Sequence, residues 1–309
     1  MKKNRIQHYS GIGGQAVIEG VMMRHRDMYA VAVRRPDGQI AVDVEEYRSL
    51  GRGSLLLRIP FVRGFFIFLN SLILGMKSLN FSASVYEESP AGEETGWKDK
   101  LVSVITTIIA IAMAVGIFVF LPYLIVDHFG EQIRNASLKA IMEGVVRIAV
   151  FVIYVLLISL MKDIRRLFRY HGAEHKCINC LESGHPLTTE YVRKASRFHK
   201  RCGSSFILFV MLVSIVVFFF IRVDVLWQKL ILRILLIPVI SGISYELIAL
   251  AGRSDFFLIK LMSAPGMLLQ RLTTKEPDDQ MIEVAIRSVE AVFDWRAYLN
   301  DAFGITTED

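Results

Sequence analysis

The sequence predicts an α-helical integral membrane protein with four transmembrane helices, one interfacial or re-entrant helix and a small N-terminal cytoplasmic β unit. The first observation behind this fold class is composition, since 53% of the 309 residues are apolar, whereas about 45–50% is usual for a soluble domain. The second is that the excess lies in four long apolar blocks. The third is that lysine and arginine gather in one of the segments between those blocks.

Four apolar blocks carry the membrane prediction, and they cover residues 101–126, 140–161, 205–221 and 230–251. Each is long enough, or nearly so, to cross roughly 30 Å of hydrocarbon at about 1.5 Å per residue. Buried helices of a large soluble core are the alternative, which four such blocks in one short chain disfavour. A fifth apolar stretch, at 65–76, has the length typical of an interfacial or re-entrant helix.

The distribution of basic residues predicts the orientation. Ten lysines and arginines lie between residues 162 and 204, against one in the 127–137 connection and two in the 222–229 connection. Because cytoplasmic connections carry the excess of positive charge, the 162–204 segment is predicted to be cytoplasmic. Four crossings then place both termini there too. The basic N-terminus has no apolar stretch of the kind found in a cleavable signal peptide, so we expect a multi-pass membrane protein.

The N-terminal residues have a β pattern. Residues 29–46 contain two β-prone runs around a Pro-Asp-Gly turn, and Ile40, Val42 and Val44 alternate with other residues as in a half-buried strand. The glycine-rich run at 11–23 lacks the Gly-Lys-Ser/Thr ending of a phosphate-binding loop. Glycines of a loop and strand are therefore the better interpretation of this run.

The chain divides into six predicted parts. After the last block, residues 274–279 resemble a helix start. Residues 280–299 then place apolar side chains on one face of a helix, which we expect to pack on the β unit or the membrane surface. The parts are a cytoplasmic β unit at 1–60, an interfacial helix and acidic linker at 61–100, transmembrane helices 1 and 2 at 101–162, a cytoplasmic loop with the candidate site at 163–204, transmembrane helices 3 and 4 at 205–251, and a cytoplasmic C-terminal helical segment at 252–309.

The 163–204 segment contains a pattern typical of metal binding. His171, Glu174 and His175 form His-x-x-Glu-His, and at about 100° per residue all three share one face of a helix. A catalytic zinc site has three protein ligands and an open position. In this first hypothesis His171 and His175 bind a divalent metal, expected to be zinc. His199 or Cys202 completes the ligand set, and Glu174 acts as the general base.

A second hypothesis uses the three cysteines, which are expected to be thiols in a reducing compartment. Cys177-x2-Cys180 and His199-x2-Cys202 are separated by 18 residues, a spacing typical of structural zinc hairpins. Such a closed Cys3His site has no open position for chemistry.

Helix geometry separates the two hypotheses. If one helix runs through 171–180, Cys177 and Cys180 lie about 240° and 180° around the axis from His171, so one ion cannot be shared by both groups. Either the helix breaks near Asn179, or only one hypothesis holds, or there are two sites. Polar loop residues without any metal are the remaining alternative.

Further ionisable residues fall in or near the apolar blocks. Glu143 and Arg147 are spaced to pair with each other on a helix, and Arg233 is placed to snorkel towards the membrane surface. Glu246 lies near the cytoplasmic end of the last block, where it could reach the site as a ligand or base, or be an ordinary interfacial carboxylate.

Four segments have distinctive sequences: GGQAVIEGVMMR at 13–24, HGAEHK at 171–176, RFHKRCG at 197–203 and LQRLTTKEPDD at 269–279. Together they resemble the YqhQ-like family of bacterial membrane proteins, a domain of unknown function often labelled a predicted metal-dependent enzyme. The resemblance covers nearly the whole chain and implies a bacterial cell-membrane location. Its shared pattern excludes the Cys-x-x-Cys at 177–180, which favours the first metal hypothesis, and implies a site of His171, Glu174, His175, His199 and Cys202.

The leading functional prediction is a membrane-embedded metal-dependent hydrolase acting at the cytoplasmic interface on a substrate that the sequence does not name. The alternative is a non-catalytic assembly or scaffold factor with a structural metal, whose basic face docks the translocation machinery or the ribosome. Basic residues beside a membrane also bind anionic lipid headgroups. The sequence contains no specific nucleic-acid motif, and the bilayer and a second copy of the chain are the other expected partners.

Overall fold

The computed structural model describes residues 8–50, 55–87, 97–130, 133, 135–199, 201–221, 223, 225–251 and 257–306. Its strands are β1 (Ile12–Val17), β2 (Gly20–His25), β3 (Met28–Arg34) and β4 (Ile40–Glu46). Its helices are η1 (Leu55–Arg58), α1 (Val62–Tyr86), α2 (Trp97–Val115), the π-helix η2 (Gly116–Phe120), α3 (Leu121–Phe129), α4 (Ala136–Ile158), α5 (Lys162–Glu182), α6 (Thr189–Lys194), α7 (Gly203–Phe219), α8 (Leu226–Leu235), α9 (Ile237–Ala251), α10 (Phe257–Thr273), α11 (Asp279–Glu290) and α12 (Trp295–Phe303).

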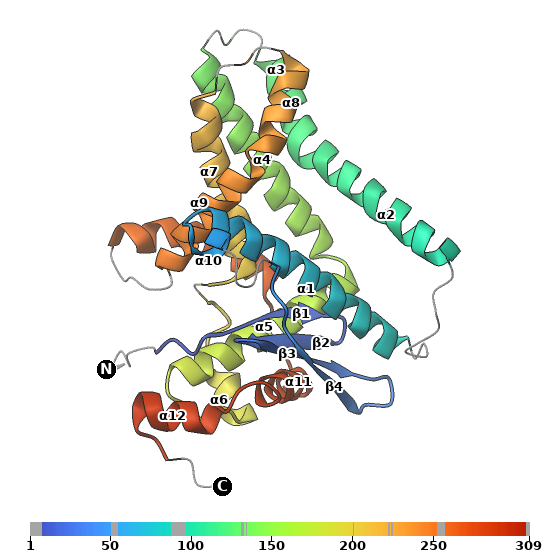
Figure 1. Cartoon of the computed structure of the whole chain (residues 1–309), viewed down its shortest axis with the longest axis vertical. Helices are drawn as coiled ribbons and strands as arrows, with labels where there is room; N and C mark the ends of the chain where they lie inside the picture. The colour runs from blue at the N-terminus through green and yellow to red at the C-terminus, as the bar shows by residue number, and fades with distance from the viewer. Residues whose placement is uncertain are drawn as a thin grey trace.

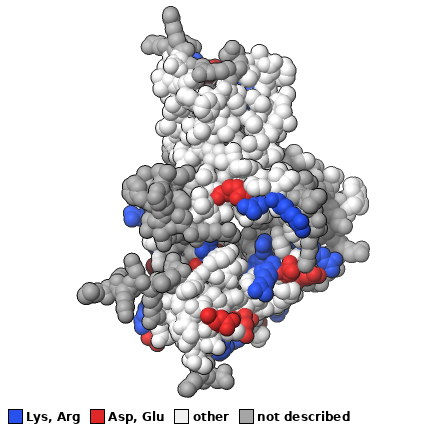
Figure 2. Space-filling model, turned by 60° about the vertical axis from the view of Figure 1, so that its left-hand side comes forward, with Lys and Arg blue, Asp and Glu red and all other residues white. Residues whose placement is uncertain are grey.

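The elements form an upper helical bundle and a lower mixed layer (Figure 1). Helices α3, α4, α7 and α8 make the upper bundle, and α1 crosses the middle of the molecule above the sheet. Helices α5, α6, α11 and α12 lie in the lower part with the sheet. Figure 2 shows the described charged side chains gathered over the lower part, while the upper bundle is almost free of them.

The four strands form one antiparallel sheet in the order β1-β2-β3-β4. The predicted Pro-Asp-Gly turn joins β3 to β4, and Gly38 there has a φ of +87°, in the region that favours glycine. Strand β4 is an edge strand, and its Val42 and Val44 are 43% and 44% exposed. The predicted half-buried strand is thus more exposed at these two valines than the sheet is at the valines of β2 and β3, because α11 packs mainly on those two strands.

Both faces of the sheet are buried under helices. Successive residues of a strand point to opposite faces, and the two sets enter different cores. One face packs on α1 through Val17, Met22, Tyr29, Val31, Val33 and Leu74. The other packs on α5 and α11, with Val21, Met23, Ala32, Tyr170, Ile178, Ile282 and Val289. The N-terminal sheet is thus the middle layer of a larger unit that needs helices from three later parts of the chain.

The predicted helix start near 274–279 is confirmed. Asp278 is the N-cap of α11, and its side chain accepts a hydrogen bond from the Met281 N–H, the usual role of an aspartate at that position. The helix packs on the β unit. It ends at Glu290, earlier than the predicted 299, because Asp294 caps a separate helix, α12.

Three described helices are long and apolar enough to cross a membrane: Val62–Tyr86, Val104–Phe129 and Ser137–Ile158. The pair Trp227–Leu235 and Ile237–Leu250 would be a fourth if counted as one span, but it is bent by 43°. Helix Ser205–Phe219 is shorter than the others. All four predicted blocks are therefore helical, and two of them qualify as spans by length without further assumption.

Helix α1 is about twice as long as the predicted 65–76 segment and joins the bundle to the sheet. Its first half packs on α9, where a Cβ on Gly64 would lie 2.7 Å from Tyr245 Cβ and a Cβ on Gly242 would lie 2.1 Å from the Phe61 carbonyl oxygen. Such small residues allow two helices to approach closely. Arg63 forms an ion pair with Glu246 across the same contact, at 2.6 Å.

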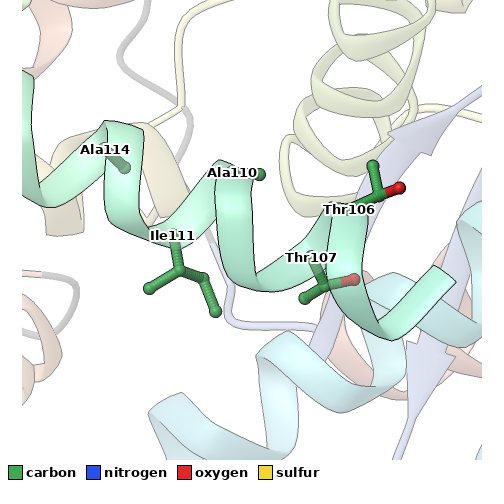
Figure 3. A pocket seen from close by; sticks show the side chains of 5 residues that line it. All are labelled: Thr106, Thr107, Ala110, Ile111 and Ala114. Carbon is green, nitrogen blue, oxygen red and sulfur yellow. The ribbon is translucent and has the colours of Figure 1, made fainter. Parts of the chain in front are cut away.

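Helix α2 stands apart from the upper bundle (Figure 1). It continues through η2 into α3, and no residue is buried in the most apolar 18-residue stretch of this continuous helix, Val104–Phe129. An open cavity of about 530 Å³ runs along it, and all of its lining residues come from α2 itself: Thr106, Thr107, Ala110, Ile111 and Ala114 (Figure 3). This lining holds no charged or metal-binding side chain.

The close contact between α1 and α9 predicts the effect of one added methyl group. Gly242→Ala should lower the free energy of unfolding by about 1–3 kcal/mol, because the new Cβ meets backbone atoms that cannot move aside. Thermal unfolding of the detergent-purified protein measures the change. Gly116→Ala is the matched control, because nothing lies within 4 Å of its new Cβ, and equal melting temperatures for the two variants would contradict the prediction.

Candidate metal centre

Three side chains with metal-binding atoms meet where the lower layer joins the bundle. His171 and His175 lie on α5, and Cys202 is the N-cap residue of α7. One ligand atom from each lies within 4.8 Å of the others, and His171 Nε2 is 3.2 Å from Cys202 Sγ. Helix α5 runs without a break from Lys162 to Glu182. Two imidazoles spaced i,i+4 therefore point to the same side of it.

The backbone around the two histidines sets which nitrogen each one presents. His171 Nδ1 is 2.8 Å from the Thr273 carbonyl oxygen, and His175 Nδ1 is 2.7 Å from the Arg197 carbonyl oxygen. A carbonyl oxygen only accepts hydrogen bonds, so Nδ1 carries the proton in both rings. Nε2 is then the nitrogen left to bind a metal, and this carbonyl contact is the usual support of a metal-bound histidine.

Glu174 lies beside the trio and is 4% exposed. Its Oε2 is buried and has no hydrogen-bond partner among the described residues. Burial raises the pKa of this carboxyl group, and the neighbouring His171 and His175 partly oppose the rise. Strand β1 covers Glu174 at Gly14, where a Cβ would lie 3.2 Å from Glu174 Cγ and 2.5 Å from the Met22 carbonyl oxygen. Only glycine fits there without a shift.

The Cys202 thiol and the His171 imidazole change each other's ionisation. Burial by itself would raise the pKa of Cys202, but His171 and His175 outweigh it and hold that pKa well below its ordinary value. Burial would likewise lower the pKa of His171, but Cys202 raises it to about 9. Each of the two groups therefore favours the charged form of the other, and the thiolate is the form of cysteine that binds metals.

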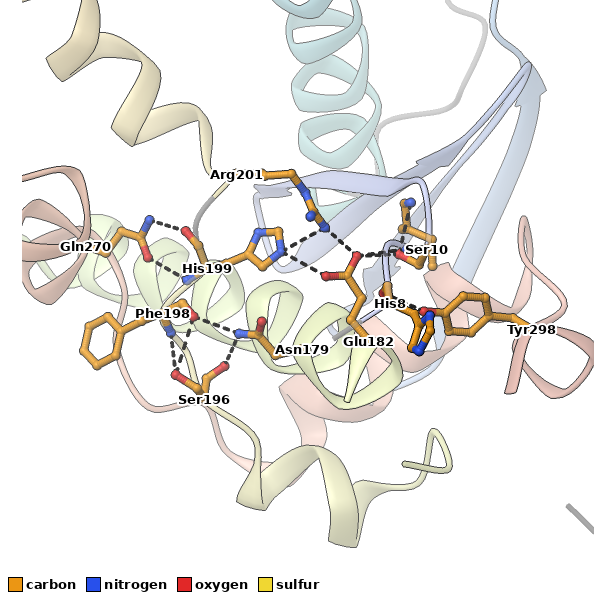
Figure 4. Close-up of polar contacts among 11 residues, drawn as sticks. His8, Ser10, Asn179, Glu182, Ser196, Phe198, His199, Arg201, Gln270 and Tyr298 are labelled. Atoms are coloured by element: carbon orange, nitrogen blue, oxygen red, sulfur yellow. Dashed lines mark hydrogen bonds and ion pairs between the residues drawn. The ribbon is translucent and has the colours of Figure 1, made fainter. Parts of the chain in front are cut away.

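His199 lies next to this trio but faces a different group. Its ring centroid is 5.6 Å from that of His175, while its Nε2 is 3.7 Å from Glu182 Oε2. Glu182 also accepts hydrogen bonds from Arg201 and from the backbone and side chain of Ser10 (Figure 4). Of the two residues predicted to complete the ligand set, the structure thus places Cys202 at the centre and His199 beside it.

The cysteine pair Cys177 and Cys180 lies on another side of α5. Both are buried in the core between α5, α11 and the sheet, and Cys180 donates to the Pro186 carbonyl oxygen at 3.3 Å. Burial raises the pKa of Cys180 to about 12 and that of Cys177 well above its ordinary value. The described residues therefore do not assemble the predicted Cys3His set, because the unbroken helix keeps this pair away from Cys202.

Glu246, the predicted accessory residue, is also elsewhere. Its two carboxylate oxygens accept hydrogen bonds from the Arg63 guanidinium at 2.7 and 2.6 Å. That pair belongs to the contact between α1 and α9. Glu246 therefore stabilises helix packing in this structure and does not line the trio.

Gln270 supports the site although the sequence did not predict it. Gln270 of α10 is fully buried, and its side-chain amide accepts from the His199 N–H at 2.9 Å and donates to the His199 carbonyl oxygen at 2.7 Å. This pair of hydrogen bonds fixes the segment that leads into Cys202. Gln270 lies in the LQRLTTKEPDD segment. The sequence identified this segment as distinctive, but it did not indicate that Gln270 contacts His199.

The chain matches a known protein family. A family model described as a protein of unknown function (DUF1385) matches residues 59–295. The chain belongs to this family. The uncharacterized protein YqhQ of Bacillus subtilis (strain 168) is 36% identical over 286 residues, which cover 89% of this chain and 90% of that protein. No solved structure matches the chain.

The DUF1385 match contains all three residues of the trio. His171, His175 and Cys202 all fall within 59–295. Segment 13–24 precedes the match, yet its Gly14 covers Glu174. The four segments that carry the resemblance to the YqhQ-like family therefore converge on one place in the fold.

The metal content of the purified protein should follow this geometry. We expect about one equivalent of a divalent metal per chain. The variants His171→Ala/His175→Ala and Cys202→Ser should both lose this metal, because each variant removes side chains that would bind it. Elemental analysis after purification without chelators measures it. Cys177→Ser/Cys180→Ser is the matched control and should keep its metal, whereas loss of metal only in this control would refute the assignment.

The two hydrogen bonds from Gln270 predict a weaker effect. Gln270→Ala should reduce metal affinity by about 10–100-fold, the range for residues that orient ligands without touching the metal. Competition with a chromophoric chelator measures the affinity. Arg271→Ala, at the exposed neighbouring position on α10, should bind as the wild type does, and equal affinities in both variants would remove Gln270 from the site.

Proposed function

We propose that this protein is a membrane-embedded metal-dependent hydrolase. The observation that carries the proposal is a set of three potential metal ligands beside the buried carboxylate of Glu174, one oxygen of which has no hydrogen-bond partner among the described residues. Three ligands are typical of catalytic zinc sites, whereas structural sites have four. Two imidazoles and a thiolate fit zinc in preference to the hard cations, which take oxygen ligands.

The chain's own residues would divide the work as follows. His171, His175 and Cys202 would hold the ion, while the Thr273 and Arg197 carbonyls keep both imidazoles in orientation. A divalent cation bound there would polarise a water molecule or a substrate carbonyl and so favour the attack of water on the substrate. Glu174 accepts the proton at Oε2, which has no competing hydrogen-bond donor among the described residues. His171 is the partly exposed member of the trio, so a substrate would approach from its side.

The membrane arrangement belongs to the same proposal. The helices over 101–126, 140–161, 205–221 and 230–251 make four spans, with the bent pair α8 and α9 counted as one. The ten basic residues between 162 and 204 support an orientation with the candidate metal centre and both termini on the cytoplasmic side of a bacterial cell membrane. Helix α1 then lies in the membrane surface, since its second half packs on the sheet.

A scaffold role is the second candidate, and one observation favours it. Cys202 caps α7 while both histidines lie on α5, so a metal bound there would also tie the lower layer to the bundle. In that case the metal is structural, and the basic face docks the translocation machinery or the ribosome.

Glu174→Gln separates the two candidates. For an enzyme, the variant should keep its metal, because Glu174 is not one of the three ligands, and lose hydrolysis. Lipid and peptide profiles of membranes from a strain lacking the gene should then show a compound that accumulates, disappears with the wild-type gene and persists with Glu174→Gln. Glu190→Gln, at an exposed position on α6, is the control. Profiles that Glu174→Gln restores as fully as the wild type would exclude catalysis.

A further inference from the structure

A second cluster of charged side chains lies inside the upper bundle, away from the metal centre. Glu143 and Arg147 of α4 form an ion pair at 2.7 Å, and Arg233 of α8 reaches the same carboxylate at 2.7 Å. Their side chains are only 10–13% exposed. Ionisable groups in such an apolar bundle are costly, so they usually have a function.

The two arginines are not used equally. Arg147 donates through all three guanidinium nitrogens, to the Phe118 carbonyl oxygen, Ser214 Oγ and Glu143 Oε1. Arg233 donates to Glu143 through Nη2, while its Nη1 is buried without a hydrogen-bond partner among the described residues. One carboxylate thus serves two guanidinium groups. The cluster carries one uncompensated positive charge, and a strong donor is left over.

A further cation lies between this cluster and the end of the bundle. Lys229 precedes Arg233 by four residues, so the two share one face of α8. Its Nζ is 5.5 Å from the centre of the Tyr123 ring of α3. With Asp127, one turn beyond Tyr123, these described side chains comprise three cations, Lys229, Arg233 and Arg147, and two anions, Glu143 and Asp127. Among these five described groups the balance is therefore still positive.

We propose that Lys229 and Arg233 bind the phosphate of an anionic phospholipid in the leaflet nearest the start of α8. Arginine and lysine are the usual donors to phosphate oxygens. Arg233 lies roughly 10 Å along α8 from its first residue at about 1.5 Å per residue, and Lys229 is one turn nearer that end. A headgroup drawn to this pair leaves its acyl chains along the apolar outside of the bundle. The inference rests on the proposed membrane location and not on the metal centre.

Lipid retention in nanodiscs tests this site. The wild type and three variants, Arg233→Gln, Lys229→Gln and Arg35→Gln, are placed in nanodiscs with equal amounts of phosphatidylglycerol and phosphatidylcholine. Native mass spectrometry then counts the lipids that stay bound. We expect the wild type to retain phosphatidylglycerol, and each bundle variant to retain about fivefold less, the effect of one cation near a membrane surface. Arg35→Gln removes the same charge from the exposed turn after β3 and should match the wild type.

Inorganic phosphate distinguishes a lipid headgroup from a free anion. If phosphate raises the melting temperature of delipidated wild type but not of Arg233→Gln, and no lipid is retained, the site takes a soluble phosphate instead. Equal phosphatidylglycerol retention in all four proteins, without an effect of phosphate, would overturn the proposal. If Arg233→Gln does not fold, Lys229→Gln decides, because it leaves the Glu143 pairs intact. Metal content measured on the same samples tests the hydrolase proposal separately.

Discussion

The lower layer depends on the hydrogen bonds that α5 donates to the end of α6 and to the non-helical segment 195–199 that follows it. Among the described residues this segment pairs with no strand, so its carbonyl groups need side-chain donors once they are buried. Lys176 donates to the carbonyls of Arg193 and Ala195, and Asn179 to those of Ser196 and Phe198. His175 serves the Arg197 carbonyl. A helix with so many buried polar residues is stable here because nearly every donor has an acceptor.

The same set of contacts builds the metal centre. The hydrogen bond to the Arg197 carbonyl also orients His175. Two residues after Arg197, the backbone of His199 is held by the side-chain amide of Gln270. Cys202 follows three residues later, at the N-cap position of α7. The position of the thiolate is therefore set by backbone packing on α5 and α10. Such support would preorganise the three side chains and make the binding of a metal less costly.

Four buried side-chain atoms of the described residues have no hydrogen-bond partner, namely Arg34 Nε, Ser78 Oγ, Glu174 Oε2 and Arg233 Nη1. The last two belong to the clusters discussed above and lie in different surroundings. Glu174 Oε2 lies in the lower layer beside three metal-binding side chains, whereas Arg233 Nη1 lies in the bundle beside a shared carboxylate. A buried donor or acceptor without a partner costs roughly 1–3 kcal/mol. Glu174 Oε2 is placed to act on a ligand of the metal centre, and Arg233 Nη1 on an anion. The proposed metal site and the proposed anion site would each supply the partner that these atoms lack.

The sequence alone determined the helical blocks, the β-hairpin around its Pro-Asp-Gly turn and the shared helix face of His171, Glu174 and His175. These features depend on short-range periodicity and on local backbone preferences. Tertiary structure decided the rest: that Cys202 and not His199 completes the trio, that Cys177 and Cys180 are core residues, and that Glu246 pairs with Arg63. Those outcomes depend on which residues distant in the chain come together. Periodicity within one segment carries no information about its partner, so β1, α5, the start of α7 and α10 could be joined into one site only by the folded chain.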